Sequence, residues 1–357
     1  MRVLAALLVT ACGAQAVTPA YHPGANPETV EGWGAVGIRD GQLVLGEGVL
    51  PYDLQTPLFT DYALKLRTVW TPRPLGGALP DDPARLPVGT VITKTFYYPE
   101  GEAGVARGEP VAVNADTGLD LSRYRLIETR VLVRREDGWH PVSYVWNEAE
   151  TEARLTRVGA VVPLTLDDVS FAYVVPNENQ CAGCHASNAT TEEIRPLGPT
   201  PGQLAGSYPY ADGAQVQLAR WTAEGLMDGA ADEAAGGIAW DDEAAPLDAR
   251  ARAYLAANCA HCHNPNGPAD TSGLDLSLTA PPGPALGTCK LPIAAGSGTG
   301  GHRYDIEPGA ADASILTYRM RSTDPGAMMP ELGRALVHEE GTALVEAWID
   351  AMDGDCG

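Results

Sequence analysis

Apolar and polar side chains alternate along several segments in the first half of the chain. Segment 124–135 places Leu126, Glu128, Arg130 and Leu132 on one face of a strand and Ile127, Thr129, Val131 and Val133 on the other. Segment 91–98 is β-branched and aromatic up to Pro99. Asp137-Gly138 then leads into segment 140–146, which is a hairpin signal. Segments 152–159 and 170–175 continue the pattern. These segments predict an antiparallel β domain over about 51–176.

Helical spacing replaces this alternation in the second half of the chain. Apolar residues recur at intervals of three and four in segments 247–258 and 340–352, and also in 214–227. In 340–352 the side chains of Leu344, Trp348 and Met352 fall on one helix face. Segment 225–237, rich in Gly, Ala and Asp, is the best candidate for an interdomain linker. Segment 17–34 contains several prolines and little periodicity, which indicates a tether.

Two short motifs interrupt this pattern. Cys181-Ala182-Gly183-Cys184-His185 and Cys259-Ala260-His261-Cys262-His263 both have the form C-x-x-C-H. This is the attachment signature of a c-type haem. Two thiols at this spacing reach the two vinyl groups of one porphyrin, and the adjacent histidine reaches the iron. The motifs therefore predict two covalently attached haem c groups, with His185 and His263 as iron ligands.

Three other interpretations of these cysteines remain open. Four cysteines and two histidines can form a zinc site, although structural zinc sites usually take their ligands from one compact knuckle. A thioredoxin-like redox pair requires a βαβ context, which neither segment has. Two plain disulfides of C-x-x-C type would leave both histidines without a role.

The other three cysteines indicate export from the cytoplasm. Cys12 follows a short basic and apolar start, as in a bacterial lipoprotein signal, with cleavage before Cys12. The alternative is an ordinary secretory signal cleaved near Ala14 or Ala16. The apolar run is too short to span a bilayer. Cys289 and Cys356 then most simply bond to each other, because disulfides persist outside the cytoplasm.

The charge balance limits the classes of partner. The formal net charge is −22, which disfavours binding to nucleic acid or to an anionic membrane surface through the body of the protein. Basic redox partners would be attracted at low ionic strength. Solubility alone accounts for the charge equally well.

The C-terminal part resembles a class I cytochrome c domain. A helix leads into the second C-x-x-C-H, a loop carries Met328-Met329-Pro330, and a last helix follows. In that family the methionine before the proline is the distal iron ligand. The resemblance therefore implies Met329 as the sixth ligand of the second haem and His263 as the fifth. Met328 competes directly for this role, and Met320 competes more weakly.

The whole pattern resembles a family of uncharacterised bacterial diheme c-type cytochromes. The resemblance rests on segments 50–54, 56–63, 176–181, 272–276 and 328–334. It implies a fold and a cofactor but no substrate. The distal ligand of the first haem is not assigned by any of these segments. The candidates are Met227, His140, His22, His302 and His338, or no residue at all.

The open ligand position separates three hypotheses of function. If both irons have two protein ligands, the chain is an electron carrier in the cell envelope. If the first iron is open, a diheme peroxidase-like oxidoreductase becomes the alternative, with Glu178 and His140 as candidate acid–base groups. In the third hypothesis the β domain is a docking module. Asp61, Tyr62 and Lys65 are candidate site residues there, or equally turn and packing positions.

The predicted fold class is α+β and multidomain. An N-terminal antiparallel β domain is followed by a loop-rich first haem segment and a C-terminal all-α class I cytochrome c-like domain. The predicted boundaries are 1–16 for the signal region, 17–50 for a tether and entry segment, 51–176 for the β domain, 177–237 for the first haem segment and linker, and 238–357 for the second haem domain. The predicted location is the cell envelope, on the periplasmic side or outer surface, with a lipid on Cys12.

Overall fold

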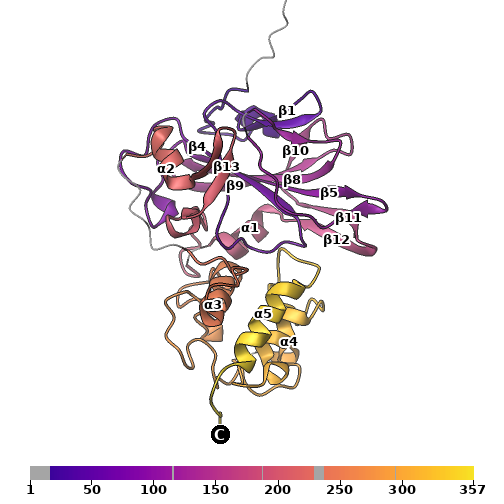
Figure 1. Cartoon of the computed structure of the whole chain (residues 1–357), viewed down its shortest axis with the longest axis vertical. Coiled ribbons are helices and arrows are strands. Elements are labelled where there is room, and N and C mark those ends of the chain that lie inside the picture. The colour runs from indigo at the N-terminus through magenta and orange to yellow at the C-terminus, as the bar shows by residue number, and fades with distance from the viewer. Residues whose placement is uncertain (1–16, 115, 187, 229–236, 294) are drawn as a thin grey trace, which may run out of the picture.

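The computed structural model describes residues 17–114, 116–186, 188–228, 237–293 and 295–357. The predicted lipoprotein signal and Cys12 lie outside these residues, as does most of the predicted linker 225–237. The sheets form one end of the molecule and the last three helices form the other, with the first C-x-x-C-H helix between them (Figure 1).

A nine-stranded sheet dominates the first half of the chain. Its strands run in the order β10-β9-β8-β5-β6-β11-β12, and β4 pairs with both β5 and β3. The bounds are β3 Leu50–Tyr52, β4 Leu64–Trp70, β5 Val91–Gly101, β6 Gly104–Val105, β8 Tyr124–Arg135, β9 Gly138–Trp146, β10 Ala153–Thr156, β11 Ala160–Leu166 and β12 Val169–Val175. The strands predicted over 91–98, 124–135, 140–146 and 170–175 are confirmed, and β8 pairs with β9 as the predicted hairpin.

Two smaller sheets complete the β structure. One contains β1 Val36–Arg39, β2 Gln42–Leu45 and β7 Leu119–Asp120, and the other contains β13 Ser207–Tyr210 and β14 Gly213–Val216. The N-terminal segment predicted to be a tether packs into this part instead. Val30 and Trp33 are completely buried, and the Trp33 indole donates a 2.7 Å hydrogen bond to the Tyr144 hydroxyl. The prolines and the low periodicity of this segment correctly predicted irregular structure, but they did not predict its buried contacts.

Five α-helices lie among the described residues. They are α1 Glu178–His185, α2 Gln217–Ala223, α3 Leu247–Asn258, α4 Ile315–Arg321 and α5 Glu339–Asp350. The helix predicted over 247–258 is confirmed, and the one predicted over 340–352 begins one residue earlier and ends at Asp350. The helix predicted over 214–227 is confined to α2, because its first residues belong to β14. Strand β12 does deliver the chain to the first C-x-x-C-H, but the motif itself lies in α1.

The predicted fold class is wrong. The described chain is rich in β structure, with three sheets, and its C-terminal part is not an all-α cytochrome c-like domain. Helices α3, α4 and α5 contain only 12, 7 and 12 residues. Most of the chain between α3 and α4 consists of turns and short 3-10 segments, because its frequent Gly and Pro residues favour turns over helix. Helical periodicity at the two ends of this region did not extend through it.

Helices α3 and α5 pack around a separate apolar core. Leu255, Val345 and Ile349 are completely buried there. Gly341 allows the close approach of the two helices, because a Cβ atom at this position would lie 2.3 Å from the Tyr254 ring. Within the part of the chain that the structure describes, no helix is long and apolar enough to cross a bilayer.

Candidate functional site: the two C-x-x-C-H segments

A capping box begins the helix that carries the first motif. The Asn177 side chain accepts a 2.9 Å hydrogen bond from the Gln180 amide, and the Gln180 side chain accepts a 3.0 Å bond from the Asn177 amide. This reciprocal arrangement satisfies two backbone donors at the helix start. Because β12 ends two residues earlier, the cap turns the chain from strand into helix. It places Cys181 in the first turn, where its thiol donates to the Asn177 carbonyl at 3.3 Å.

The second motif continues directly from α3. Asn258, the last residue of the helix, accepts a 2.8 Å hydrogen bond from the Phe59 amide and donates to the Tyr254 carbonyl at 3.0 Å. Cys259 forms the helix C-cap. The His263 amide donates to the Cys259 carbonyl at 2.9 Å, so the motif folds into a compact turn. The β part of the molecule therefore contacts the second motif through the residue next to its first cysteine.

Both motif histidines are held through the same ring nitrogen. His185 Nδ1 donates to the Arg195 carbonyl at 2.7 Å. His263 Nδ1 lies 3.0 Å from the Ser272 hydroxyl, which donates its own proton to the Ala269 carbonyl at 2.7 Å. His263 must therefore donate as well. In both residues Nδ1 carries the proton and Nε2 keeps its lone pair. Burial lowers the pKa of each imidazole to about 4.

The fold brings the two motifs into contact. The Cys262 thiol donates to the Gly183 carbonyl at 3.2 Å across a separation of 79 residues. Nearby, the Ala189 amide donates to the Asn266 carbonyl at 2.9 Å. Cys184 and His261 line both of the cavities that flank this contact. The sequence predicted both motifs but gave no indication that they form one site.

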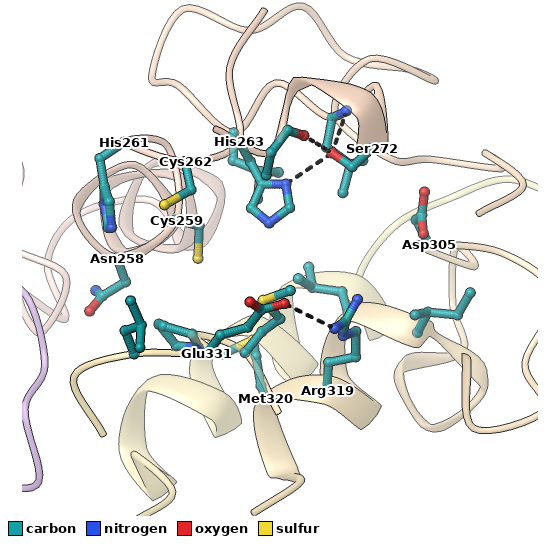
Figure 2. A pocket seen from close by; sticks show the side chains of 18 of the residues that line it. Asn258, Cys259, His261, Cys262, His263, Ser272, Asp305, Arg319, Met320 and Glu331 are labelled. Atoms are coloured by element: carbon teal, nitrogen blue, oxygen red, sulfur yellow. Dashed lines mark hydrogen bonds and ion pairs between the residues drawn. The ribbon is translucent and has the colours of Figure 1, made fainter. Parts of the chain in front are cut away.

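One cavity, of about 460 Å³, adjoins the second motif. Cys259, Cys262 and His263 face it from one side, and Arg319, Met320 and Glu331 face it from the other (Figure 2). Met329, the predicted ligand, also lines this cavity, whereas Met328 does not. His338 is a further lining residue, and its ring stacks on Phe59 with 4.2 Å between centroids.

The other cavity, of about 540 Å³, lies between the first motif and the large sheet. Cys181, Cys184 and His185 line it together with residues of β4, β5 and β8. Its walls carry six basic side chains: Lys65, Arg67, Lys94, Arg130, Arg195 and Arg334. The sequence contains only three lysines, and two of them are here. Their position in otherwise apolar strands was the signal that could have singled them out.

Several candidates from the sequence lie outside both cavities. Met227 packs in an apolar cluster with Trp221 and Leu218. His140 pairs with Asp137 at 2.8 Å, and Glu178 pairs with Arg157 at 3.2 Å. His22 bonds the Gly32 carbonyl, and His302 contacts the ring of Tyr318. None of these five residues is among those that line either cavity, so the acid–base roles considered for Glu178 and His140 have no support here.

The prediction of two haem c groups is corrected. Among the described residues, no group of three or more His, Cys, Asp or Glu side chains is arranged to hold a metal ion. The thiols of Cys181 and Cys262 instead make hydrogen bonds to backbone carbonyls, and the surrounding fold is not that of a cytochrome c. The four cysteines do not form the alternative zinc site either.

Burial dominates the electrostatics of the four thiols. None of them is in a disulfide. Burial raises the pKa of Cys259 and of Cys262 to about 12. It also raises the pKa of Cys181 and Cys184, where the positive charge of Arg130 opposes the effect. The protonated thiol is therefore the resting form of all four at neutral pH. By contrast, Cys289 and Cys356 form a disulfide with an S–S distance of 2.09 Å.

Comparison with known proteins adds no relative to this picture. No protein-family model, no curated protein and no solved structure matches the chain.

Proposed function

We propose that this chain is a redox protein that transfers electrons between partners in the cell envelope. Its redox site is the junction of the two C-x-x-C-H segments. The observation that carries this proposal is the contact between Cys262 and Gly183. It joins two cysteine pairs that are far apart in the sequence, so that electrons accepted by one pair have a second pair beside them.

Cysteine sulfur supplies electron chemistry of its own. Each pair releases two electrons and two protons when its sulfurs form a disulfide, and takes them back on reduction. An envelope thiol–disulfide partner would accept or supply these electrons. Because the thiolate is the reactive form, the raised thiol pKa values keep exchange with unselective oxidants slow. A partner must therefore dock at the junction before exchange becomes fast.

Two further features support an envelope location and a basic partner. The Cys289–Cys356 disulfide is typical of proteins in oxidising compartments. The net charge of −22 favours encounter with positively charged partners, an effect that salt would weaken.

Voltammetry of the exported, full-length protein tests the proposal. Above the potential at which the Cys289–Cys356 disulfide is reduced, we expect a reversible redox response in the wild type, a smaller response in Cys181→Ser/Cys184→Ser and in Cys259→Ser/Cys262→Ser, and none when all four are replaced. Cys289→Ser/Cys356→Ser is the matched control and should keep the full response. A wild type without any response, or a quadruple variant with an unchanged one, would contradict the assignment.

Peptide mapping tests the state of the sulfurs directly. After denaturation and reduction, all four motif cysteines should react with iodoacetamide. In the native protein at neutral pH, Cys259 and Cys262 should react more slowly than in the unfolded protein, because a thiol with an ordinary pKa of about 8.5 is ionised to a larger extent there. A permanent added mass on any of the four would rule out reversible thiol chemistry at that pair.

A further inference from the structure

Three cations stand in a row across the large sheet on the face that lines the 540 Å³ cavity. In the strand register Arg67 of β4 is opposite Lys94 of β5, and Lys94 is opposite Arg130 of β8. Lys65 lies two residues before Arg67 on β4, so it is on the same face of the sheet, and it is opposite Phe96. Like charges directly opposite each other destabilise a sheet. A row of this kind therefore needs negative charge to balance it.

The four arginines of the cavity already have partners. Arg67 pairs with Asp53 at 2.7 Å. Arg130 makes two bonds to the completely buried Glu128, at 2.9 and 2.5 Å. Arg195 pairs with Asp82 at 3.5 Å. The Arg334 guanidinium donates four hydrogen bonds, to the backbone carbonyls of Met329, Leu336, Arg319 and Ser322. Apart from the buried Nε of Arg195, which has no hydrogen-bond partner among the residues that the structure describes, these guanidinium groups are therefore held by groups of the protein itself.

Neither lysine of the cavity has a carboxylate partner in the described part of the chain. Among the described residues, no carboxylate lies within 4.0 Å of the ammonium nitrogen of Lys65 or Lys94. Lys65 donates to the Ala63 carbonyl at 3.2 Å. Lys94 lies over the Phe96 ring, 5.1 Å from its centroid. Burial, with the positive charge of Arg130 and Arg67, lowers the pKa of Lys94 to about 7. It also lowers the pKa of Lys65.

The rest of the cavity wall is largely apolar. Leu54, Ile92, Leu132 and Val142 line it, and the first motif contributes Cys181 and Cys184 to the lining. An inorganic anion would leave these apolar surfaces uncovered. Phosphate is bound best by free guanidinium forks, whereas Arg67, Arg130 and Arg334 already bind groups of the protein. A lysine ammonium instead binds a carboxylate as a point charge.

We propose that this cavity binds an organic carboxylate, with an apolar body against the leucine and isoleucine side chains and its carboxylate groups on Lys65 and Lys94. The two lysines are diagonal neighbours on adjacent strands, which places their Cβ atoms roughly 7 Å apart. A dicarboxylate can therefore contact both ammonium groups. The bound molecule lies beside the first cysteine pair, and its binding does not depend on the redox function proposed above.

Calorimetric titration of the full-length protein with benzene-1,4-dicarboxylate tests this site. This probe is a rigid apolar body with a charge at each end, and the uncharged benzene-1,4-dicarboxamide is its control. We expect saturable binding of the dicarboxylate alone. Lys94→Met and Lys65→Met should each weaken it by about tenfold or more, the effect of losing one charged hydrogen-bond donor. Arg73→Met removes an exposed cation outside the cavity and should leave the affinity unchanged.

A thermal melt of each variant keeps the test decisive. Methionine removes a buried amine that has no carboxylate partner in the described chain, at similar volume, so Lys94→Met should unfold at the same temperature as the wild type or higher. A clearly lower melting temperature would mean that the ammonium group has a stabilising partner within the protein, which would overturn the proposal. Absence of dicarboxylate binding in the millimolar range, or unchanged binding in the double variant Lys65→Met/Lys94→Met, would overturn it equally. The variants keep all four motif cysteines, so the voltammetric response reports on the redox proposal independently.

Discussion

The Asp61 carboxylate accepts a 2.7 Å hydrogen bond from the Leu336 amide, 275 residues further along the chain. The same oxygen accepts a second 2.7 Å bond from the Ala335 amide. Asp61 is almost completely buried and has a left-handed backbone, with φ of 46°. These bonds hold the segment that precedes α5 against the turn before β4. The carboxylate therefore stabilises the arrangement of the sheet and the helices on which the junction of the two motifs depends.

Replacing Asp61 should loosen this arrangement. Asp61→Ala removes two charge-assisted bonds, so we expect the free energy of unfolding to fall by about 3 kcal/mol, measured by urea denaturation. Asp40 is also left-handed, with φ of 50°, but its side chain is exposed. Asp40→Ala therefore measures the backbone cost alone and should lower stability by about 1 kcal/mol. Equal losses in the two variants would show that the bonds to Ala335 and Leu336 contribute nothing.

His338 should make the protein sensitive to acid. Its ring stacks on Phe59 and its Nδ1 lies 2.9 Å from the Tyr254 hydroxyl. Burial lowers its pKa to about 4, whereas an unfolded histidine titrates near 6.5. Between these values the unfolded state binds the additional proton, so the stability is fully present above about pH 6.5 and is lost as the pH falls toward 4.

Urea denaturation between pH 7 and pH 4.5 measures this effect. His338→Gln should be less stable at pH 7, but its stability should fall less steeply with acid, by up to about 1.4 kcal/mol per pH unit. His140 is half-exposed beside Asp137, and His140→Gln is the matched control. Identical slopes in the wild type and His338→Gln would contradict the predicted role of this histidine.

Glu128 should be the most sensitive polar position of the sheet. Its side chain is completely buried and accepts hydrogen bonds from Arg130 and from the Tyr173 hydroxyl, the latter at 2.7 Å. Glu128→Gln leaves the Arg130 guanidinium without its counter-charge and should cost about 3–5 kcal/mol in urea denaturation. The double variant Glu128→Gln/Arg130→Met should recover part of this loss. No recovery would indicate that the cost comes from Tyr173 and packing instead.

The Cys289–Cys356 disulfide should stabilise the C-terminal region. It closes a loop across 67 residues, for which the chain-entropy model predicts about 4 kcal/mol. Cys289→Ser/Cys356→Ser should therefore unfold at lower urea concentration. The wild type in the presence of a reductant should approach the same midpoint, while the variant should not change. A wild type that ignores the reductant would show that the bond is absent in solution or adds no stability.

Local patterns were sufficient for the elements themselves. Alternation predicted β8 and β9, because a strand exposes successive side chains to opposite faces. Helical spacing predicted α3 and α5 for the corresponding reason. The same local evidence failed between α3 and α4, where turns rich in Gly and Pro replaced the expected helical domain. It also failed for 17–34, where Val30 and Trp33 are buried by partners that follow much later in the chain.

The sequence by itself determined the two C-x-x-C-H motifs, the scarcity of lysine and the acidic charge, since these depend only on which residues are present. Tertiary structure alone decided that Cys262 meets Gly183, that Lys94 stands between Arg67 and Arg130, and that His338 is buried against Phe59. Each of these contacts depends on strand register or on packing between distant segments. Such pairings are set by the summed burial of many side chains, which no short stretch of sequence contains.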